Sequence, residues 1–324
     1  MQPPVEHVEH AVFHRALRAE VEDPNRLGLA RWLVAPENPL TARVYVNRLW
    51  ERFFGTGLVK TSENLGAQAD MPSHPELLDW LATEFVARHW DTKAIVKLIV
   101  TSSTYRQTSA ASARLRERDP ENRLLARGPR VRLPAEAVRD CALAASGLLV
   151  EHVGGPSVRP YRPGEERQSS PDLYRRSVYS FWERTNFNPS LASFDATARE
   201  ACVLKRARTN TPLQALALLN EVTYVEAARK LAERMMMAAP EVAGRIKAGF
   251  EMALGRDPSA AEATTLAQLF DKHLREFKTS QNDAKLFLAQ GASKPDASLH
   301  PEQLAAFALV ASTLINLDEF ITKE

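Results

Sequence analysis

The sequence predicts a mainly α-helical protein, a multi-helical globular domain with at most a small β element around residues 156–182. First, capped amphipathic segments recur on both sides of a single Gly/Pro-rich interruption. Second, the alternation typical of strands is scarce and short. Third, a chain of 324 residues with 44% hydrophobic and 25% charged residues can bury a substantial core.

Residues 1–24 are expected to be a tail or a leftover linker, without the basic and apolar regions of a signal peptide. His7, His10 and His14 share a helical spacing there, but few carboxylates and no thiol accompany them, so we predict no metal site. From residue 25 onwards the pattern is helical. We therefore predict one helical domain over residues 25–324, with two lobes, 25–132 and 133–324, as the alternative.

Helices of the first lobe are predicted within residues 26–34, 38–55, 72–90 and 91–109. Ser73 and Glu76 have the spacing of a capping box, in which each side chain satisfies a backbone N–H at the helix start. Asp91 is expected to be the N-cap of the fourth helix.

An arginine-rich connector follows the first lobe's helices. Between Tyr105 and Arg132 the sequence has eight arginines and three carboxylates, a local excess of five positive charges. A nucleic-acid surface would also need stacking aromatic side chains, and Tyr105 alone is present. We therefore predict a solvated, partly ion-paired surface and no nucleic-acid partner.

In the second lobe, a helix is predicted within residues 133–150, followed by a loop and a short strand within 175–185. Ser259 and Glu262 form a second predicted capping box, at the start of a helix over residues 260–277. The apolar segment 301–324 predicts a closing helix packed deep in the core.

The segment 205–220, KRARTNTPLQALALLN, predicts the start of a helix over residues 212–232. Thr211 can be the N-cap, Pro212 suits the first helical position, and Gln214 can complete a capping box. Because the first turns are apolar, we expect this half of the helix to be buried. Charged residues come only in its later half: Glu226, Arg229, Lys230 and Glu233.

Cations before a helix N-terminus are unfavourable unless an anion lies among them. Arg199, Cys202 and Arg206 have the spacing of one helical face, which would point towards the same place. The anion is either a carboxylate of the protein, from Glu183, Asp195 or Glu200, or a bound ligand. We favour the internal carboxylate. The candidate anion- or ligand-binding residues are Arg184, Asp195, Arg199, Arg206, Arg208 and Asn210.

Several long strings resemble one known family. They include NPLTARVYVNRLWERFFGTGLVKTSE (38–63), PSHPELLDWLATEF (72–85) and FDATAREACVLKRARTNTPLQALALLN (194–220). The chain resembles, over about residues 25–324, the planctomycete-type domain of unknown function 1553, or PSD domain. The string ENLG (63–66) departs from the acidic-aromatic-glycine string of that family. The resemblance implies a periplasmic or cell-envelope setting, in longer proteins that carry a cytochrome c-like segment upstream.

Two functions are consistent with these observations. The first is a non-catalytic helical accessory or interaction domain of a larger cell-envelope protein, with a cytochrome c-like or other domain as partner. The alternative is a hydrolase-like enzyme acting on an anionic or carbohydrate substrate through an Arg/Asp pocket at residues 183–210, with Trp182 for stacking. No catalytic motif supports the enzyme.

The two cysteines, Cys141 and Cys202, occur in neither a CxxC nor a CxxCH motif. We therefore predict no haem and no other cofactor, and expect both thiols to be buried. No apolar run has the roughly 20 residues of a membrane helix, so we predict no membrane span.

Overall fold

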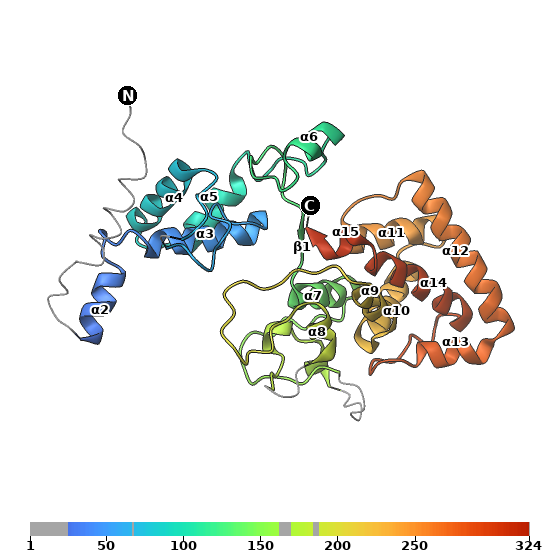
Figure 1. The fold of residues 1–324 in the computed structure, drawn as a ribbon. Helices are drawn as coiled ribbons and strands as arrows, with labels where there is room; N and C mark the ends of the chain where they lie inside the picture. The colour runs from blue at the N-terminus through green and yellow to red at the C-terminus, as the bar shows by residue number, and fades with distance from the viewer. Residues whose placement is uncertain (1–24, 67, 162–169, 184–187, 324) are drawn as a thin grey trace. The chain divides into compact units, whose positions relative to one another are not determined.

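The computed structural model describes residues 25–66, 68–161, 170–183 and 188–323, and it is mainly α-helical, as predicted (Figure 1). A two-stranded sheet pairs β1 (Val131–Arg132) with β2 (Thr322–Lys323). In the described backbone, two isolated parallel bridges involve residues 156–182, Val150 with Arg175 and Val158 with Ser180. The strand predicted within 175–185 is wrong: the chain there forms the 3-10 helix η2 (Ser177–Tyr179), which follows η1 (Pro171–Tyr174).

The described residues form two compact units, 25–131 and 132–323. The first contains α2 (Arg26–Leu33), α3 (Thr41–Phe54), α4 (Pro75–Ala87), α5 (Thr92–Thr101) and α6 (Ala113–Arg118). Its core lies among α3, α4 and α5, and its members include Val46, Trp50, Leu81, Phe85 and Ile95. Whether residues 25–324 are one domain or two lobes stays a prediction.

Local caps decide where the helices of the first unit begin. Asp91 is the N-cap of α5 and accepts from the N–H of Ala94 at 3.0 Å, as predicted. The predicted capping box of Ser73 is wrong, because His74 is the N-cap of α4 and Pro75 its first residue. The hydroxyl of Ser73 instead lies 3.0 Å from Nδ1 of His74.

The connector's arginines are used in part to bind backbone carbonyls. Arg123 donates to the carbonyls of Gly57 and Leu58 at 2.7 and 2.8 Å, and Arg127 donates to that of Pro120 at 2.8 Å. These contacts tie the loop after α3 to the segment after α6. Part of the connector is therefore architectural.

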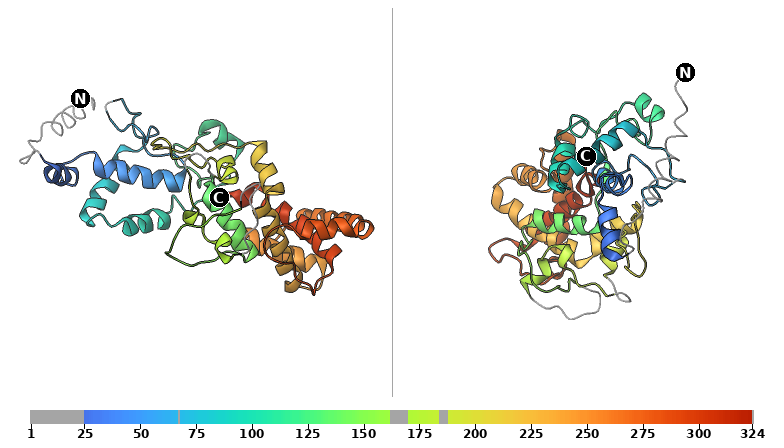
Figure 2. Two further views of the ribbon diagram at one scale, coloured as in Figure 1. Left: turned by 90° about the horizontal axis from the view of Figure 1, so that it is seen from below. Right: turned by 90° about the vertical axis from the view of Figure 1, so that its left-hand side faces the viewer.

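The second unit contains α7 to α15. Its helices are α7 (Ala135–Ser146), α8 (Pro189–Ser193), α9 (Pro212–Asn220), α10 (Val222–Ala238), α11 (Val242–Leu254), α12 (Ala260–Thr279), α13 (Gln281–Leu288), α14 (Pro301–Ile315) and α15 (Asp318–Ile321). Helices α10 to α13 gather around α14 (Figures 1 and 2). As predicted, α14 is buried in the core, and Ser259 and Glu262 form the capping box of α12.

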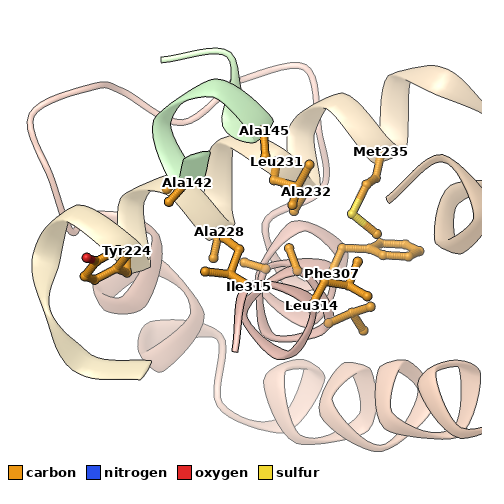
Figure 3. Packing of buried hydrophobic residues seen from close by; sticks show 14 of the residues in the cluster. Ala142, Ala145, Tyr224, Ala228, Leu231, Ala232, Met235, Phe307, Leu314 and Ile315 are labelled. Atoms are coloured by element: carbon orange, nitrogen blue, oxygen red, sulfur yellow. The ribbon is translucent and has the colours of Figure 1, made fainter. Parts of the chain in front are cut away.

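Small residues let α10 approach its neighbours closely. Figure 3 shows Ala228 and Ala232 of α10 beside Phe307 and Ile315 of α14. On another side of α10 lies α7, with Ala145 facing it. Because close packing leaves little room for larger side chains, this core fixes α10 on both sides.

The predicted helix over 212–232 is interrupted. Glu221 ends α9 and begins α10, accepting from the N–H of Thr223 at 3.0 Å. The first turns are also not buried as predicted: of α9, only Gln214 and Leu218 are buried. The two cysteines differ from the expectation as well, since Cys141 is half-buried and Cys202 is exposed.

Candidate functional site

Asp195 lies in a turn that follows α8. Its φ of 63° is in the left-handed region, which aspartate tolerates better than most residues. Its carboxylate accepts from the N–H of Thr209 at 2.7 Å and from the hydroxyl of Thr209 at 2.9 Å. The aspartate thus joins residue 195 to the segment just before α9.

The arginines around Asp195 contact other groups. Arg206 donates to both carboxylate oxygens of Glu136, at 2.9 Å each, so its anion is a carboxylate of α7. Arg199 lies over the ring of Trp182, 4.7 Å from its centre. Residues 195–211 are not helical, so the predicted common helical face of Arg199, Cys202 and Arg206 is wrong.

The remaining candidates are Arg184, Arg208 and Asn210. Arg208 and Asn210 are both exposed. Arg184 lies outside the described residues. Gln214, expected in a capping box, instead accepts from Arg132 at 2.8 Å and donates to the hydroxyl of Thr209 at 3.2 Å. Asp195, Thr209 and Gln214 are therefore linked by hydrogen bonds at the start of α9.

The start of α9 presents an apolar stripe to solvent. Leu213, Leu216 and Leu219 are 61%, 54% and 43% exposed, whereas Leu218 on the opposite side is 1% exposed. The three exposed leucines follow one another at intervals of three residues, so they lie along one side of the helix. We call these three residues the α9 surface.

A buried polar cluster lies deeper, on α10. The carboxylate of Glu226 has no exposed surface and accepts from the hydroxyls of Tyr161 and Tyr174 at 2.7 and 2.8 Å. It also accepts from the N–H and the hydroxyl of Ser293, at 2.6 and 2.5 Å. A Cβ on Gly291 would lie 2.3 Å from this carboxylate. The segment between α13 and α14 can therefore approach Glu226 only because residue 291 is a glycine.

Two further charges complete this Glu226 cluster. Arg229 donates to Glu233 at 2.9 Å and to the carbonyl and hydroxyl of Ser293, each at 2.8 Å. Glu233 also accepts from Lys230. Arg229 and Glu233 are each 1% exposed. A buried charge is stable when it is paired and fully hydrogen-bonded, and this cluster meets that condition for Glu226.

The chemistry of the cluster follows from its contacts. Burial raises the pKa of Tyr161, and its hydrogen bond with Glu226 raises that pKa further. Burial also raises the pKa of Tyr174, so both hydroxyls stay protonated donors. Glu226 has no exposed surface, and both of its carboxylate oxygens accept from protein groups. The Glu226 cluster therefore holds the fold together.

Sequence reasoning missed this cluster: it placed these charges in the later half of the predicted 212–232 helix and did not predict that they are buried. A signal was present: Glu226, Arg229 and Glu233 share one face of this helix, at i, i+3 and i+7. The tyrosines and the serine that satisfy Glu226 are distant in sequence, and no local pattern joins them.

Within the described residues there is no group of three or more His, Cys, Asp or Glu side chains placed to hold a metal ion. Among the same residues, no helix is both long and apolar enough to cross a membrane.

Comparison with known proteins identifies the family of the chain. A model of the PSD1 family, described as "Protein of unknown function (DUF1553)", matches residues 25–270. The chain belongs to the PSD1 family. The match spans all of the first unit's helices and, in the second, the α9 surface and Glu226. No curated protein and no solved structure matches the chain.

Proposed function

We propose that this PSD1 domain is a non-catalytic helical accessory domain that docks a partner protein through the α9 surface. Burial of a leucine side chain is worth roughly 1.5–3 kcal/mol, so three leucines left exposed on one helix leave binding energy available. Exposed apolar patches with polar rims are typical of protein–protein interfaces. The leucine stripe is the observation that carries the proposal.

The charge near α9 supports a partner with an acidic rim. Residues 201–220 contain three cations and no carboxylate. Two of these cations, Lys205 and Arg208, are exposed. Complementary charges around an apolar centre speed association and fix orientation. The resemblance to longer cell-envelope proteins favours a cytochrome c-like or other domain of such a protein as the partner.

Two polar groups of the proposed Arg/Asp pocket, Asp195 and Arg206, support this function over the hydrolase alternative. A general base needs a free acceptor position within hydrogen-bonding distance of the substrate. Both oxygens of Asp195 accept from Thr209, and the guanidinium of Arg206 is held by Glu136. These contacts favour a structural role for the segment, so that it positions α9.

A photo-crosslinking amino acid at position 216, introduced in the cells that produce the protein, tests the proposal. We expect it to trap one acidic protein or domain, and the same amino acid at position 286 to trap none. Leu286 is 59% exposed on α13, which makes it a matched control. The trapped protein is then purified and titrated against the chain.

The titration includes two variants. Leu216→Ser should weaken binding by about tenfold, as expected for a central interface residue, and Leu286→Ser should not change it. Affinity should also fall as salt rises. Equal trapping at positions 216 and 286, or trapping of a second copy of this chain, would overturn the proposed partner.

A further inference from the structure

A pocket of about 350 Å³ lies in the second unit, and none of its lining residues belongs to α9. Four helices line it: α7 with Cys141, Ala144 and Ala145, α10 with Arg234, α11 with Met252 and Ala253, and α15 with Phe320. Its volume is within the range of pockets that bind small molecules, about 300–1,000 Å³. Its wall is apolar at Met252, Ala253 and Phe320 and polar at Arg234.

Arg234 is the one charged side chain among the described residues that line this pocket. Its Nη1 donates to the carbonyls of Ala144 and Ala145, at the end of α7. A Cβ on Gly147 would lie 3.3 Å from Cδ of Arg234, so the side chain runs closely over that glycine. Arg234 is an exposed residue, and these contacts restrict its side chain before a ligand binds, which lowers the entropic cost of binding.

The charge of Arg234 is not neutralised inside the pocket. No Asp or Glu is among the described lining residues, and neither Nη2 nor Nε of Arg234 makes a hydrogen bond within the described chain. A guanidinium presents its donors in a planar fork that matches a carboxylate. An apolar wall next to such a fork fits a molecule with an apolar body and a carboxylate end.

The thiol of Cys141, which also lines the pocket, does not oppose the binding of a carboxylate. Burial raises the pKa of Cys141, and the nearby charge of Asp140 raises it further. The group therefore stays a neutral thiol near neutral pH and adds no negative charge that would repel an anion. It also provides a reporter inside the pocket.

We propose that this pocket binds an apolar carboxylate, with the apolar part against Met252 and Phe320 and the carboxylate paired with Arg234. The same chemistry belongs to a free medium-chain carboxylic acid and to the carboxy-terminal residue of a peptide. The two sources differ in what surrounds the carboxylate, and the experiment separates them.

The rate at which iodoacetamide alkylates Cys141 measures occupancy. In a Cys202→Ser background Cys141 is the remaining cysteine, because the chain has two. Octanoate should slow alkylation, whereas octanol and octylamine should need concentrations at least about tenfold higher for the same protection. A short peptide ending in Leu with a free carboxylate, compared with its amide, tests the second source. Whichever of the two, octanoate or the peptide, protects Cys141 at the lower concentration identifies the kind of ligand that the pocket binds.

Two variants test the role of Arg234. Arg234→Gln should raise the half-protecting octanoate concentration by about tenfold, and Arg275→Gln, an exposed arginine of α12, should leave it unchanged. Ala253→Glu puts a carboxylate into the pocket and should abolish protection while Arg234 is kept. Circular dichroism checks that each variant is folded, and octanoate should raise the melting temperature of the Cys202→Ser protein.

Absence of protection by octanoate and by the peptide would overturn the proposal. So would equal protection by octanol, or protection that Ala253→Glu leaves intact. None of these outcomes bears on the α9 surface, which the crosslinking experiment tests separately.

Discussion

Glu226 has four protein donors around its carboxylate, supplied by Tyr161, Tyr174 and Ser293. Because the side chain has no exposed surface, water cannot replace a donor that is removed. Each hydroxyl is therefore worth more here than at the surface, since hydrogen bonds to charged groups exceed those between neutral groups.

Tyr174→Phe should lower the free energy of unfolding by about 1.5–3 kcal/mol, because one donor to a buried carboxylate is lost. Tyr45→Phe is the matched control: its hydroxyl lies 2.9 Å from that of Thr92 and is exposed, so the change should be within about 0.5 kcal/mol. Urea unfolding followed by circular dichroism measures both. Equal losses for the two variants would contradict a special role of the cluster.

Two glutamates should affect stability in opposite directions as the pH changes. Burial raises the pKa of Glu221 above its ordinary value of 4.5. Its native state therefore binds a proton more tightly than the unfolded state does. The contribution of Glu221 to stability is greatest below pH 4.5 and declines as the pH rises through the native pKa.

The opposite holds for Glu262, because the Arg256 guanidinium lowers its pKa to about 2. Its contribution is present above pH 4.5 and is lost as the pH falls towards 2. Relative to Glu221→Gln, the wild type should lose stability as the pH rises from 4.5. Relative to Glu262→Gln, it should lose stability as the pH falls below 4.5. Urea unfolding across this pH range measures both differences, and differences of the same sign would contradict the assignment.

At the scale of helices, the sequence predicted those features that depend on neighbours in the chain. The cap at Asp91 and the capping box of Ser259 involve residues three positions apart, so local pattern was enough. The break at Glu221 and the exposure of Leu213 and Leu216 depend on what packs against α9 and α10. Apolar composition alone could not distinguish a buried helix start from a surface for a partner.

The two predicted capping boxes provide a matched test. Ser259→Ala should cost about 1 kcal/mol, because a hydrogen bond to the first turn of α12 is lost. Ser73→Ala should be within about 0.5 kcal/mol, because Ser73 caps no helix. Urea unfolding of the two variants measures the difference, and a larger loss for Ser73→Ala would reverse the assignment.

At the scale of the whole molecule, the residues that the structure describes form two hydrophobic cores. One includes Val46, Trp50 and Phe85 of the first unit, and the other includes Leu231, Phe307 and Leu314 of the second. The overall helical class followed from periodicity. The candidate site was harder to predict, since Glu136 lies 70 residues from Arg206, which it binds.

A chain of residues 132–324 should fold by itself, because the larger core is contained within it. We expect a helical circular dichroism spectrum and a single cooperative thermal transition. Loss of either one, with recovery when residues 25–131 are added, would show that the second unit depends on the first.

The position of α14 has a consequence for how this domain can be inherited and exchanged. The PSD1 match ends at residue 270, whereas α14 begins at Pro301 and forms the centre of the larger core. Ser293, which binds Glu226, also lies beyond residue 270. The segment that the family model matches is therefore shorter than the segment that forms the core of the second unit. Any recombination that moves this domain between genes has to carry the sequence through residue 321, or α10 loses the helix against which it packs.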